Sequence, residues 1–497
     1  MFNDLRNLVK HSSIYTFGNI ASKMIGIILI PLYTKVLVVE IFGIYSILEV
    51  TMQFLMGFLH FGLPTAMIRW LSLEKYKDKK RTILFSVTLT LFLIGLLNFS
   101  LFYLFKKEIS FLLFSNYKHS FVLLIISIII RLRLINRPFL NYLRYLEKSL
   151  TFTVVNLTRF LVQLLVTIYF VAFLKFGLIG IFNGLLAGEL IIAVLLLPQT
   201  IREFSLKFET KEIIEMLKFG FPLSFSSISN RILNMGDRYV LGFLTNWSLV
   251  GIYSLGYKFA NLIDTIFIKA FRTAFLPTAW KKLHDKNAKS FYSKLFTYYI
   301  FFIFWISTFI SIYAKEIIQL FARNESYWNA YIITPIAVFS IGIKGSFSIL
   351  RMGLQFQKKT KYIAYIVIIS ALLNIGLNFV LIPFWGMIGA ALATFISFVF
   401  MIFLAYKISN SFYSINFEWR RILKIIITII ILYLLAISSN QLYWIFKILI
   451  KLILFLSFPF ILYLFKFYEE KEINRIKGSW SKWKNIDTWK KIISSKK

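Results

Sequence analysis

The stretch VKHSSIYTFGNIASK, from Val9 to Lys23, decides how the rest of the chain is interpreted. Polar or small residues recur in and just beyond it at spacings of four, three, four and three, namely Ser12, Thr16, Asn19, Lys23 and Gly26. That spacing places all five on one face of a helix. Lys23 lies about 16 Å beyond Ser12, near the middle of a hydrocarbon layer about 30 Å thick. A lysine there costs about 2.5–3.5 kcal/mol to insert, so it needs a wet cavity, a partner or an anionic ligand.

The same pattern returns 208 residues later in LKFGFPLSFSSISNR, from Leu217 to Arg231. Its polar stripe again carries a cation at the position of the lysine and consists of Gly220, Ser224, Ser227, Arg231 and Asn234. EIFGIYSI from Glu40 aligns with SLVGIYSL from Ser248 at this offset of 208, and FGLIG from Phe176 aligns with WGMIG from Trp385 at an offset of 209. The repeat predicts two lobes of the same orientation, related by a pseudo-twofold axis along the membrane normal.

The composition indicates a polytopic membrane protein. Of the 497 residues, 58% are hydrophobic and 16% are charged, whereas about 25% are charged in a soluble protein. Apolar runs of spanning length fall at residues 12–33, 40–63, 82–105, 119–141, 150–174, 177–198, 218–236, 249–275, 290–313, 327–350, 361–382, 386–407, 421–439 and 441–466. We therefore predict an all-α membrane protein of about fourteen transmembrane helices, arranged as two pseudo-symmetric six-helix lobes and a C-terminal helix pair. The expected boundaries are 1–200 for the first lobe, 201–217 for a cytoplasmic linker, 218–408 for the second lobe, and 409–497 for the helix pair and a basic cytoplasmic tail.

The charge pattern predicts the orientation. The formal net charge is +35, and the basic residues fall mainly in alternate loops. The positive-inside rule explains such a distribution more simply than nucleic-acid binding does. We therefore expect a multi-pass protein of the cytoplasmic (inner) membrane, with both termini in the cytoplasm. The absence of cysteine excludes disulfides and thiolate chemistry.

Motifs of enzymes are absent from the sequence. It contains no GxxxxGK[ST] loop and no GxSxG, HExxH or DxD motif, and its four histidines are scattered. We therefore expect no catalytic residues, no metal site and no cofactor, and we do not expect an enzyme.

Several segments resemble one known family. They are PLYTKVL from Pro31, VEIFGIYSI from Val39, FGLPTAMIRW from Phe61, GDRYVLGFL from Gly236, VGIYSLGYKFANLI from Val250 and FLPTAWKK from Phe275. With the stripe helix, they are similar to Wzx-type flippases for O-antigen and capsule repeat units. These belong to the MOP superfamily, which also contains lipid II flippases and MATE exporters.

The resemblance implies a MATE-like V shape with a central cationic cavity. It also implies a function: movement of undecaprenyl-pyrophosphate-linked oligosaccharide across the cytoplasmic membrane by alternating access, for surface polysaccharide biosynthesis. The expected partners are this substrate, membrane lipids, and the polysaccharide polymerase and glycosyltransferases of the pathway. We expect a monomer that binds no nucleic acid. One alternative is a cation-coupled MATE-like exporter of small molecules, and another is a membrane-embedded glycosyltransferase or polymerase.

Substrate binding is assigned first to Lys23 and Arg231, as cations that meet the pyrophosphate. The alternative is that they snorkel or pair internally, for example with Asp264. A second set on or beside the same faces is expected to bind sugar hydroxyls, or else to pack helices, and consists of Asn19, Asn230 and Asn234. A third set extends the cationic track, or snorkels, and consists of Lys258, Lys344 and Arg159.

Four charged residues are candidates for ion coupling or gating. Asp264 lies within the eighth span and could carry proton or sodium coupling, or could simply pair with a nearby cation such as Lys258. Glu189 in the sixth span is a second candidate for coupling. Asp237 and Arg238 end the seventh span, where a gate at the outer mouth and an interfacial ion pair are both open. Further basic residues are interpreted as lining the cavity or as marking cytoplasmic ends: Arg131, Arg133 and Arg137 in the fourth span, and Arg69 and Arg272 as anchors.

Overall fold

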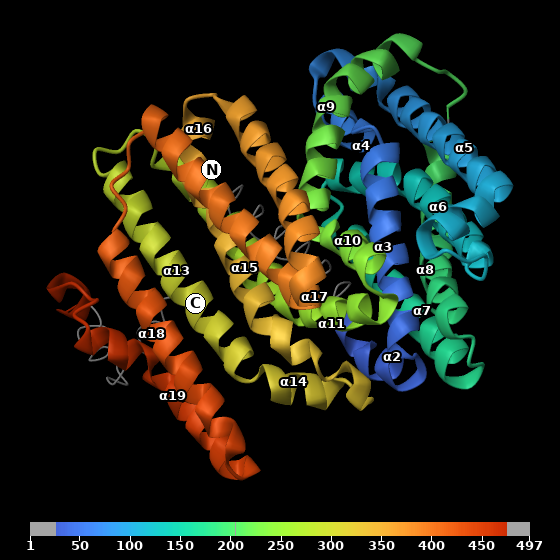
Figure 1. Cartoon of the computed structure of the whole chain (residues 1–497). Helices are drawn as coiled ribbons and strands as arrows, with labels where there is room; N and C mark the ends of the chain where they lie inside the picture. Colours follow the sequence, from blue (N-terminus) through green and yellow to red (C-terminus); the bar gives the residue numbers. More distant parts are fainter. Residues whose placement is uncertain (1–25, 204, 475–497) are drawn as a thin grey trace, which may run out of the picture. The chain divides into compact units, whose positions relative to one another are not determined.

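The computed structural model describes residues 26–203 and 205–474, apart from the side chains of Leu223 and Ser226. Ser12, Thr16, Asn19 and Lys23 of the first stripe, and the basic tail from residue 475, lie outside the described residues. The helices are α2 (Ile30–Val36), α3 (Val39–Leu59), α4 (Leu63–Leu71), α5 (Lys80–Phe114), α6 (Ser120–Tyr145), α7 (Ser149–Ile168), α8 (Gly177–Arg202), α9 (Thr210–Met235), α10 (Asp237–Leu244), α11 (Trp247–Ile263), α12 (Lys269–Lys281), α13 (Ala288–Ile312), α14 (Ala314–Phe321), α15 (Ala330–Leu350), α16 (Met352–Phe356), α17 (Thr360–Phe412), α18 (Trp419–Ser438) and α19 (Trp444–Leu464) (Figure 1).

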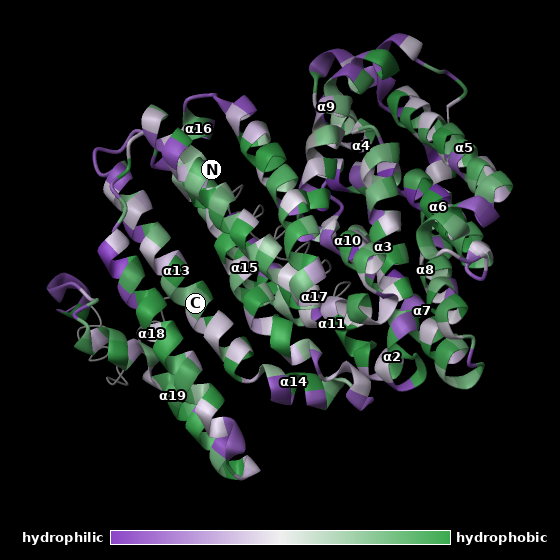
Figure 2. Cartoon of the chain, viewed as in Figure 1, coloured by the Kyte–Doolittle hydropathy of each residue, from purple (hydrophilic) through white to green (hydrophobic). Residues whose placement is uncertain are grey.

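The prediction of an all-helical membrane protein is confirmed. Within residues 26–203 and 205–474, nine helical segments are long and apolar enough to cross a membrane. The longest, α17, has 53 residues and is two helices joined across a kink at Gly386, so it contains two of the predicted spans. Hydrophilic residues gather where α4 connects to α5 and near the start of α9, while the helices are largely apolar (Figure 2). The exact number of spans stays a prediction.

The chain forms two compact units. The first comprises Met1–Lys281 and Ala314–Tyr413, and the second comprises Lys282–Tyr313 and Ser414–Lys497. Both copies of the GIYS motif therefore lie in the first unit, whereas α13 belongs to the same unit as α18 and α19. This division follows spatial contacts, while the boundaries expected from the sequence follow the repeat and stay a prediction.

Within the first unit, α3 and α11 pack at equivalent positions of the two repeats. The Ser46 hydroxyl donates a hydrogen bond of 2.6 Å to the hydroxyl of Ser254, which lies 208 residues later and is its equivalent in the second repeat. Gly43 and Gly251, another pair at this offset, bring the two backbones together. A Cβ atom on Gly43 would lie 1.8 Å from the carbonyl oxygen of Trp247. Residues that meet their own equivalents lie on a twofold axis, so the pseudo-twofold axis passes between α3 and α11.

A second close approach joins the start of α4 to α9. Gly62 has φ +70°, in the left-handed region, and its Cβ position is 2.2 Å from the carbonyl oxygen of Gly220. His60 Nδ1 accepts the Gly62 N–H at 2.9 Å and so holds this turn. The rings of Phe61 and Phe221 stack beside it with centroids 6.1 Å apart. Only glycine combines this backbone conformation with such a close approach.

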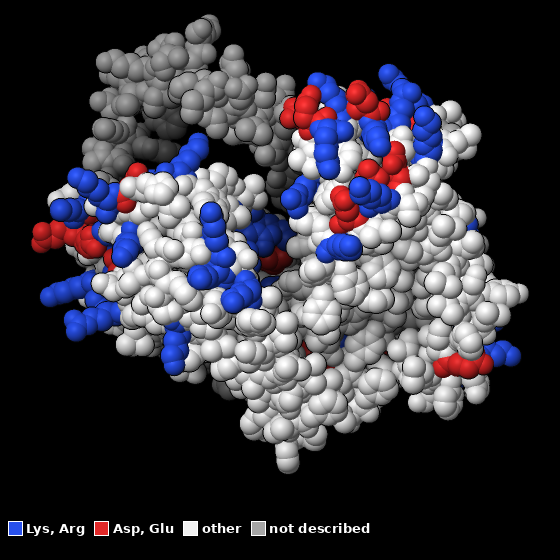
Figure 3. Space-filling model, turned by 90° about the horizontal axis from the view of Figure 1, so that it is seen from above, with Lys and Arg blue, Asp and Glu red and all other residues white. Residues whose placement is uncertain are grey.

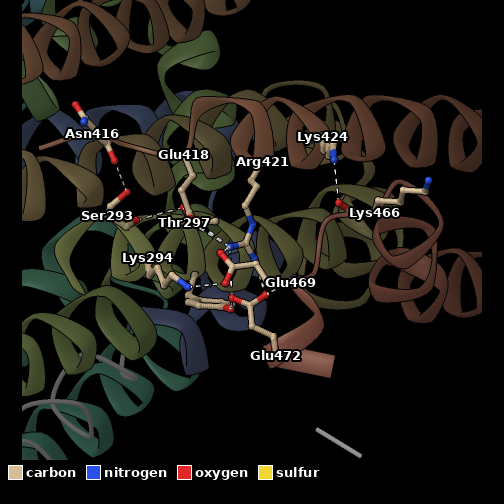
Figure 4. A network of polar contacts seen from close by, with 11 residues as sticks. Ser293, Lys294, Thr297, Asn416, Glu418, Arg421, Lys424, Lys466, Glu469 and Glu472 are labelled. Atoms are coloured by element: carbon tan, nitrogen blue, oxygen red, sulfur yellow. Dashed lines mark hydrogen bonds and ion pairs between the residues drawn. The ribbon is translucent and has the colours of Figure 1, made fainter. Parts of the chain in front are cut away.

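The second unit is tied together by a charged network (Figure 4). Arg421 of α18 binds Glu472 at 2.9 Å and Glu418 at 3.2 Å. Lys294 of α13 binds Glu469 at 2.7 Å, so the segment after α19 is held to both helices. Burial alone would raise the pKa of Glu472, but hydrogen bonds from Tyr298, from the Glu469 backbone N–H and from Arg421 lower that pKa overall.

Candidate functional site

Two chambers of the first unit share a wall made by Gln53 of α3 and Arg231 of α9. The N-terminal chamber has a volume of about 490 Å³ and is lined by Gln53, Met56, Arg133, Asn136, Arg137, Leu140, Asn141, Arg144, Phe152, Arg159, Glu189 and Arg231. The C-terminal chamber has a volume of about 630 Å³ and is lined by Gln53, Ser227, Asn230, Arg231, Asn234, Met235, Tyr257, Asn261, Asp264, Thr265, Lys269, Arg272, Ile341, Lys344, Thr394 and Phe398. Each volume is in the range of small-molecule sites.

The lining of both chambers is strongly cationic. Among the lining residues that the structure describes, the cations are Arg133, Arg137, Arg144, Arg159, Arg231, Lys269, Arg272 and Lys344, and the carboxylates are Glu189 and Asp264. Figure 3 shows basic and acidic side chains together at the floor of a hollow. An excess of positive charge in a chamber walled by apolar helices attracts anions and repels cations.

In the N-terminal chamber, Glu189 of α8 neutralises part of this charge. Its side chain is 2% exposed and accepts hydrogen bonds from Arg133 of α6 at 2.7 Å and from Arg159 of α7 at 2.6 Å. Asn136 donates to the backbone carbonyl of Glu189 at 3.0 Å. One carboxylate therefore fixes two guanidinium groups, and the remaining charge of the chamber comes from the other arginines.

Arg231, at the shared wall, is held much less firmly. Its guanidinium donates to the side-chain oxygen of Gln53 at 3.5 Å, and its buried Nε has no hydrogen-bond partner among the described residues. The side chain lies along Gly57, where a Cβ atom would be 2.9 Å from Nε. Glycine at this position therefore makes room for the guanidinium. An incompletely satisfied buried cation is a candidate for ligand binding.

The C-terminal chamber combines cations with amide side chains. Asp264 pairs with Lys269 at 2.8 Å, a partner that the sequence did not indicate. Asp264 begins a π-helical turn, Asp264–Ile268, between α11 and α12, and Lys269 directly follows that turn. Such turns are frequent at functional sites. The Lys344 ammonium lies 5.8 Å from the ring centroid of Phe398. Asn230 and Asn234 supply hydrogen-bonding groups on the face that carries Arg231.

Asp237 and Arg238 form a buried network instead of an exposed pair at a mouth. Their side chains are 1% and 6% exposed, and they pair at 3.2 Å. Asp237 also accepts hydrogen bonds from the hydroxyls of Tyr253 and Thr394, and Arg238 lies over the rings of Tyr253 and Tyr257. This network joins α10, α11 and α17. The gating role assigned to the pair stays a prediction.

Lys258 of α11 lies outside both chamber linings. Its ammonium faces three aromatic rings, Tyr45 at 4.8 Å, Phe42 at 5.2 Å and Tyr33 at 6.0 Å. These rings come from α2 and α3, so the contact joins the two repeats. Cation–π contacts of a desolvated ammonium stabilise by about 2 kcal/mol, which makes this lysine a bridge between the halves in the described structure.

The structure therefore brings together seven of the candidates. Those that line one chamber or the other are Arg159, Glu189, Arg231, Asn230, Asn234, Asp264 and Lys344, with Arg231 common to both. Arg133 and Arg137 line the N-terminal chamber, whereas Arg131 of the same helix lies over the ring of Phe92. Arg272, interpreted as an anchor, lines the C-terminal chamber. Gln53, Arg144 and Lys269 were not singled out, because helical spacing does not reveal which side chains face each other across two repeats.

Comparisons with known proteins agree with this architecture. The family model described as "Polysaccharide biosynthesis protein" matches residues 8–283, and the model described as "MatE" matches residues 222–380. The probable low-salt glycan biosynthesis flippase Agl15 of Haloferax volcanii is 26% identical over 200 residues, which are 40% of this chain and 42% of the relative. The aligned region thus spans less than half the length of that relative.

Two solved structures share the fold. The lipid II flippase MurJ, in an inward closed conformation, matches with a TM-score of 0.74 and 20% identity, covering 91% of this chain and 99% of that one. A multidrug resistance MATE family transporter of the MOP superfamily, in an inward-facing conformation, matches with a TM-score of 0.61 and 14% identity, covering 80% of this chain and 94% of that one. At these identities the likeness establishes the fold.

Proposed function

Because the chain belongs to the polysaccharide biosynthesis protein family, we propose that it is a flippase for lipid-linked oligosaccharides. The substrate is an undecaprenyl-pyrophosphate-linked repeat unit of a surface polysaccharide, which the protein moves across the cytoplasmic membrane. The observation that carries this proposal is the pair of cationic chambers inside a multi-pass membrane protein. A pyrophosphate supplies the negative charge that these side chains lack, and charge-assisted hydrogen bonds from guanidinium groups suit its oxygens.

The proposed transport cycle is alternating access. The loop between α4 and α5 carries Lys75, Lys77 and Lys79, and the segment that leads into α9 carries Arg202 and Lys207. By the positive-inside rule, the proposed orientation has both segments in the cytoplasm, together with both termini. The contact between Gly62 and Gly220 then closes the cytoplasmic side, and the contact between Ser46 and Ser254 closes the outer side. Each contact has to separate in turn for a headgroup to pass.

Transport requires an energy source, and we propose proton or sodium coupling. The candidate carboxylates for coupling are Glu189, Asp237 and Asp264. Glu189 is held by two arginines, and Asp237 is held by a buried network. Asp264 lines the C-terminal chamber and its side chain is 25% exposed. It is therefore the carboxylate best placed to exchange an ion with the chamber.

We also propose that the flippase works as a monomer without a cofactor and is not an enzyme. Its proposed partners are the polymerase and the glycosyltransferases of its pathway.

The runner-up is a MATE-like exporter of small molecules, which the MatE match favours. The cationic lining argues against cationic drugs as its substrates, because they would be repelled.

The test is transport of a fluorescent undecaprenyl-pyrophosphate oligosaccharide by the purified full-length protein in proteoliposomes. We expect transport by the wild type and a loss of about tenfold to a hundredfold in Arg231→Gln, since a hydrogen bond to a charged group contributes about 1.5–3 kcal/mol. Lys23→Gln is expected to behave similarly. Absence of wild-type transport, or full activity of both variants, would contradict the proposal.

Arg131→Gln is the matched control, because Arg131 lies on α6 but stacks on Phe92 outside both chambers. It removes the same charge from a helix whose other arginines, Arg133 and Arg137, line the N-terminal chamber. Equal losses in Arg131→Gln and Arg231→Gln would show that general positive charge, and not the chamber wall, explains the effect.

A further inference from the structure

The two chambers differ in how their cations are neutralised. In the N-terminal chamber, Glu189 is bound by two arginines and its backbone carbonyl by Asn136. The repeat offsets of 208 and 209 make Asn136 equivalent to Lys344, and Glu189 equivalent to Phe398. In the C-terminal chamber the internal carboxylate is thus replaced by a phenyl ring, and the amide that faces the carboxylate is replaced by a lysine.

This exchange leaves positive charge facing the C-terminal chamber. Lys344 lies over Phe398 at 5.8 Å, within electrostatic range of Asp264, Lys269 and Arg272. Asp264 pairs with Lys269 at 2.8 Å, and neither Lys344 nor Arg272 forms an ion pair within residues 26–203 and 205–474. The single carboxylate, Asp264, cannot neutralise the three positive charges of Lys269, Lys344 and Arg272. Lys344 is half-buried and Arg272 is exposed at the chamber lining, so both are open to an anion from outside, which the excess of positive charge attracts.

The same chamber presents groups that bind sugars. Asn230, Asn234 and Asn261 line it together with Tyr257 and Thr265. Side-chain amides and hydroxyls both donate and accept hydrogen bonds, as sugar hydroxyls require. A chamber that combines amides with two cations lacking an internal counterion suits a sugar that carries a negative substituent better than a neutral sugar.

Resting on the proposed flippase function, we propose that the C-terminal chamber binds an anionic sugar of the lipid-linked oligosaccharide, through Lys344 and Arg272. The substituent is a carboxylate or a phosphate on the glycan. The pyrophosphate is bound separately, on the N-terminal side of the wall formed by Gln53 and Arg231. The transported repeat unit is therefore acidic, with negative charge at two places along its length.

The first test is calorimetric titration of the detergent-solubilised full-length protein with three monosaccharide probes, in the presence of saturating inorganic pyrophosphate. The probes are methyl glucuronide, glucose 6-phosphate and neutral methyl glucoside. We expect at least one anionic probe to bind about tenfold or more tightly than the glucoside, as a charge-assisted hydrogen bond predicts. If methyl glucuronide binds more tightly, the substituent is a carboxylate; if glucose 6-phosphate does, the substituent is a phosphate. Equal binding of all three probes, or no binding of the anionic probes while pyrophosphate saturates the protein, would overturn the proposal. Neither result depends on a variant.

The second test uses Lys344→Gln combined with Arg272→Gln. This variant is expected to lose the preference for the anionic probe and to keep pyrophosphate binding, whereas Arg137→Gln in the N-terminal chamber is expected to show the reverse. Retention of the anionic preference in the first variant would refute the assignment. Transport assays separate this inference from the general function: equal transport of neutral and acidic lipid-linked oligosaccharides would leave the flippase proposal intact and overturn the acidic-glycan proposal.

Discussion

Removal of the Glu189 carboxylate is expected to destabilise the first unit more than removal of any other chamber carboxylate. In Glu189→Gln the side chain keeps its size, but Arg133 and Arg159 lose their common counterion. The glutamate is 2% exposed, and the two guanidinium groups are 19% and 24% exposed. Breaking a buried ion pair by removing one partner costs about 3–5 kcal/mol. Because both guanidinium groups can still reach the chamber, we expect about 3 kcal/mol, at the lower end.

Asp264→Asn is the matched control in the other chamber. Asp264 and Lys269 are 25% and 36% exposed, although their separation of 2.8 Å is nearly the same as in the Glu189 pairs. Partly exposed ion pairs contribute about 0–1 kcal/mol. Burial, and not distance, therefore predicts a loss for Asp264→Asn at least threefold smaller than for Glu189→Gln.

The assay is thermal unfolding of both purified variants in one detergent, followed by tryptophan fluorescence. Glu189→Gln is expected to lower the melting temperature clearly, and Asp264→Asn to change it little. The combination of Glu189→Gln with Arg159→Met should regain part of the loss, since it removes one uncompensated cation. Equal shifts for Glu189→Gln and Asp264→Asn, or a further loss in the combined variant, would refute the reasoning.

Three further predictions concern other parts of the protein. In this cysteine-free chain, Ser46→Cys combined with Ser254→Cys should form a disulfide under mild oxidation and stop transport until a reductant is added; full transport by the cross-linked protein would contradict alternating access at this contact. Gly43→Ala should destabilise the protein by about 1–3 kcal/mol through overpacking, whereas Gly376→Ala, with nothing within 4 Å of its Cβ position, serves as a control in thermal unfolding. Because the pKa of Glu472 is lowered in the folded protein, its stabilising effect is present above the usual glutamate pKa of about 4.3 and is lost as the pH falls through the lowered value. The difference in melting temperature between wild type and Glu472→Gln should therefore shrink from pH 7 to pH 4, and a constant difference would refute this.

The sequence was sufficient to predict the helical membrane architecture and the register of its repeat. Hydrophobic runs report helices directly, because each span has to satisfy its own backbone hydrogen bonds in lipid. The offset of 208 between the two GIYS motifs predicted equivalence, and the bond between Ser46 and Ser254 confirms it. Cations within spans were recognisable for a similar reason, since their insertion is costly unless a cavity or partner receives them.

The pairing of those cations could not be predicted in the same way. Periodicity places a residue on a face of its own helix, but it does not identify the neighbour across the interface. Lys258 and Asp264 lie in one apolar run and are natural partners by sequence, yet Lys258 lies among rings of α2 and α3 and Asp264 pairs with Lys269. Arg272 was interpreted as an anchor because it lies near a helix end, although it lines the C-terminal chamber.

The distance of a residue from the pseudo-twofold axis explains where the two repeats remain alike and where they differ. At the axis each residue meets its own equivalent, so Gly43 and Gly251 must both be small. A larger side chain at either position would displace the backbone at the other. Away from the axis, equivalent residues face different surroundings and can change independently. Glu189 and Phe398 are such a pair, and the first neutralises arginines while the second leaves Lys344 available to a ligand. A duplicated fold can thus keep a symmetric contact between its halves and still build two chambers with different chemistry, as a substrate with two different anionic groups would require.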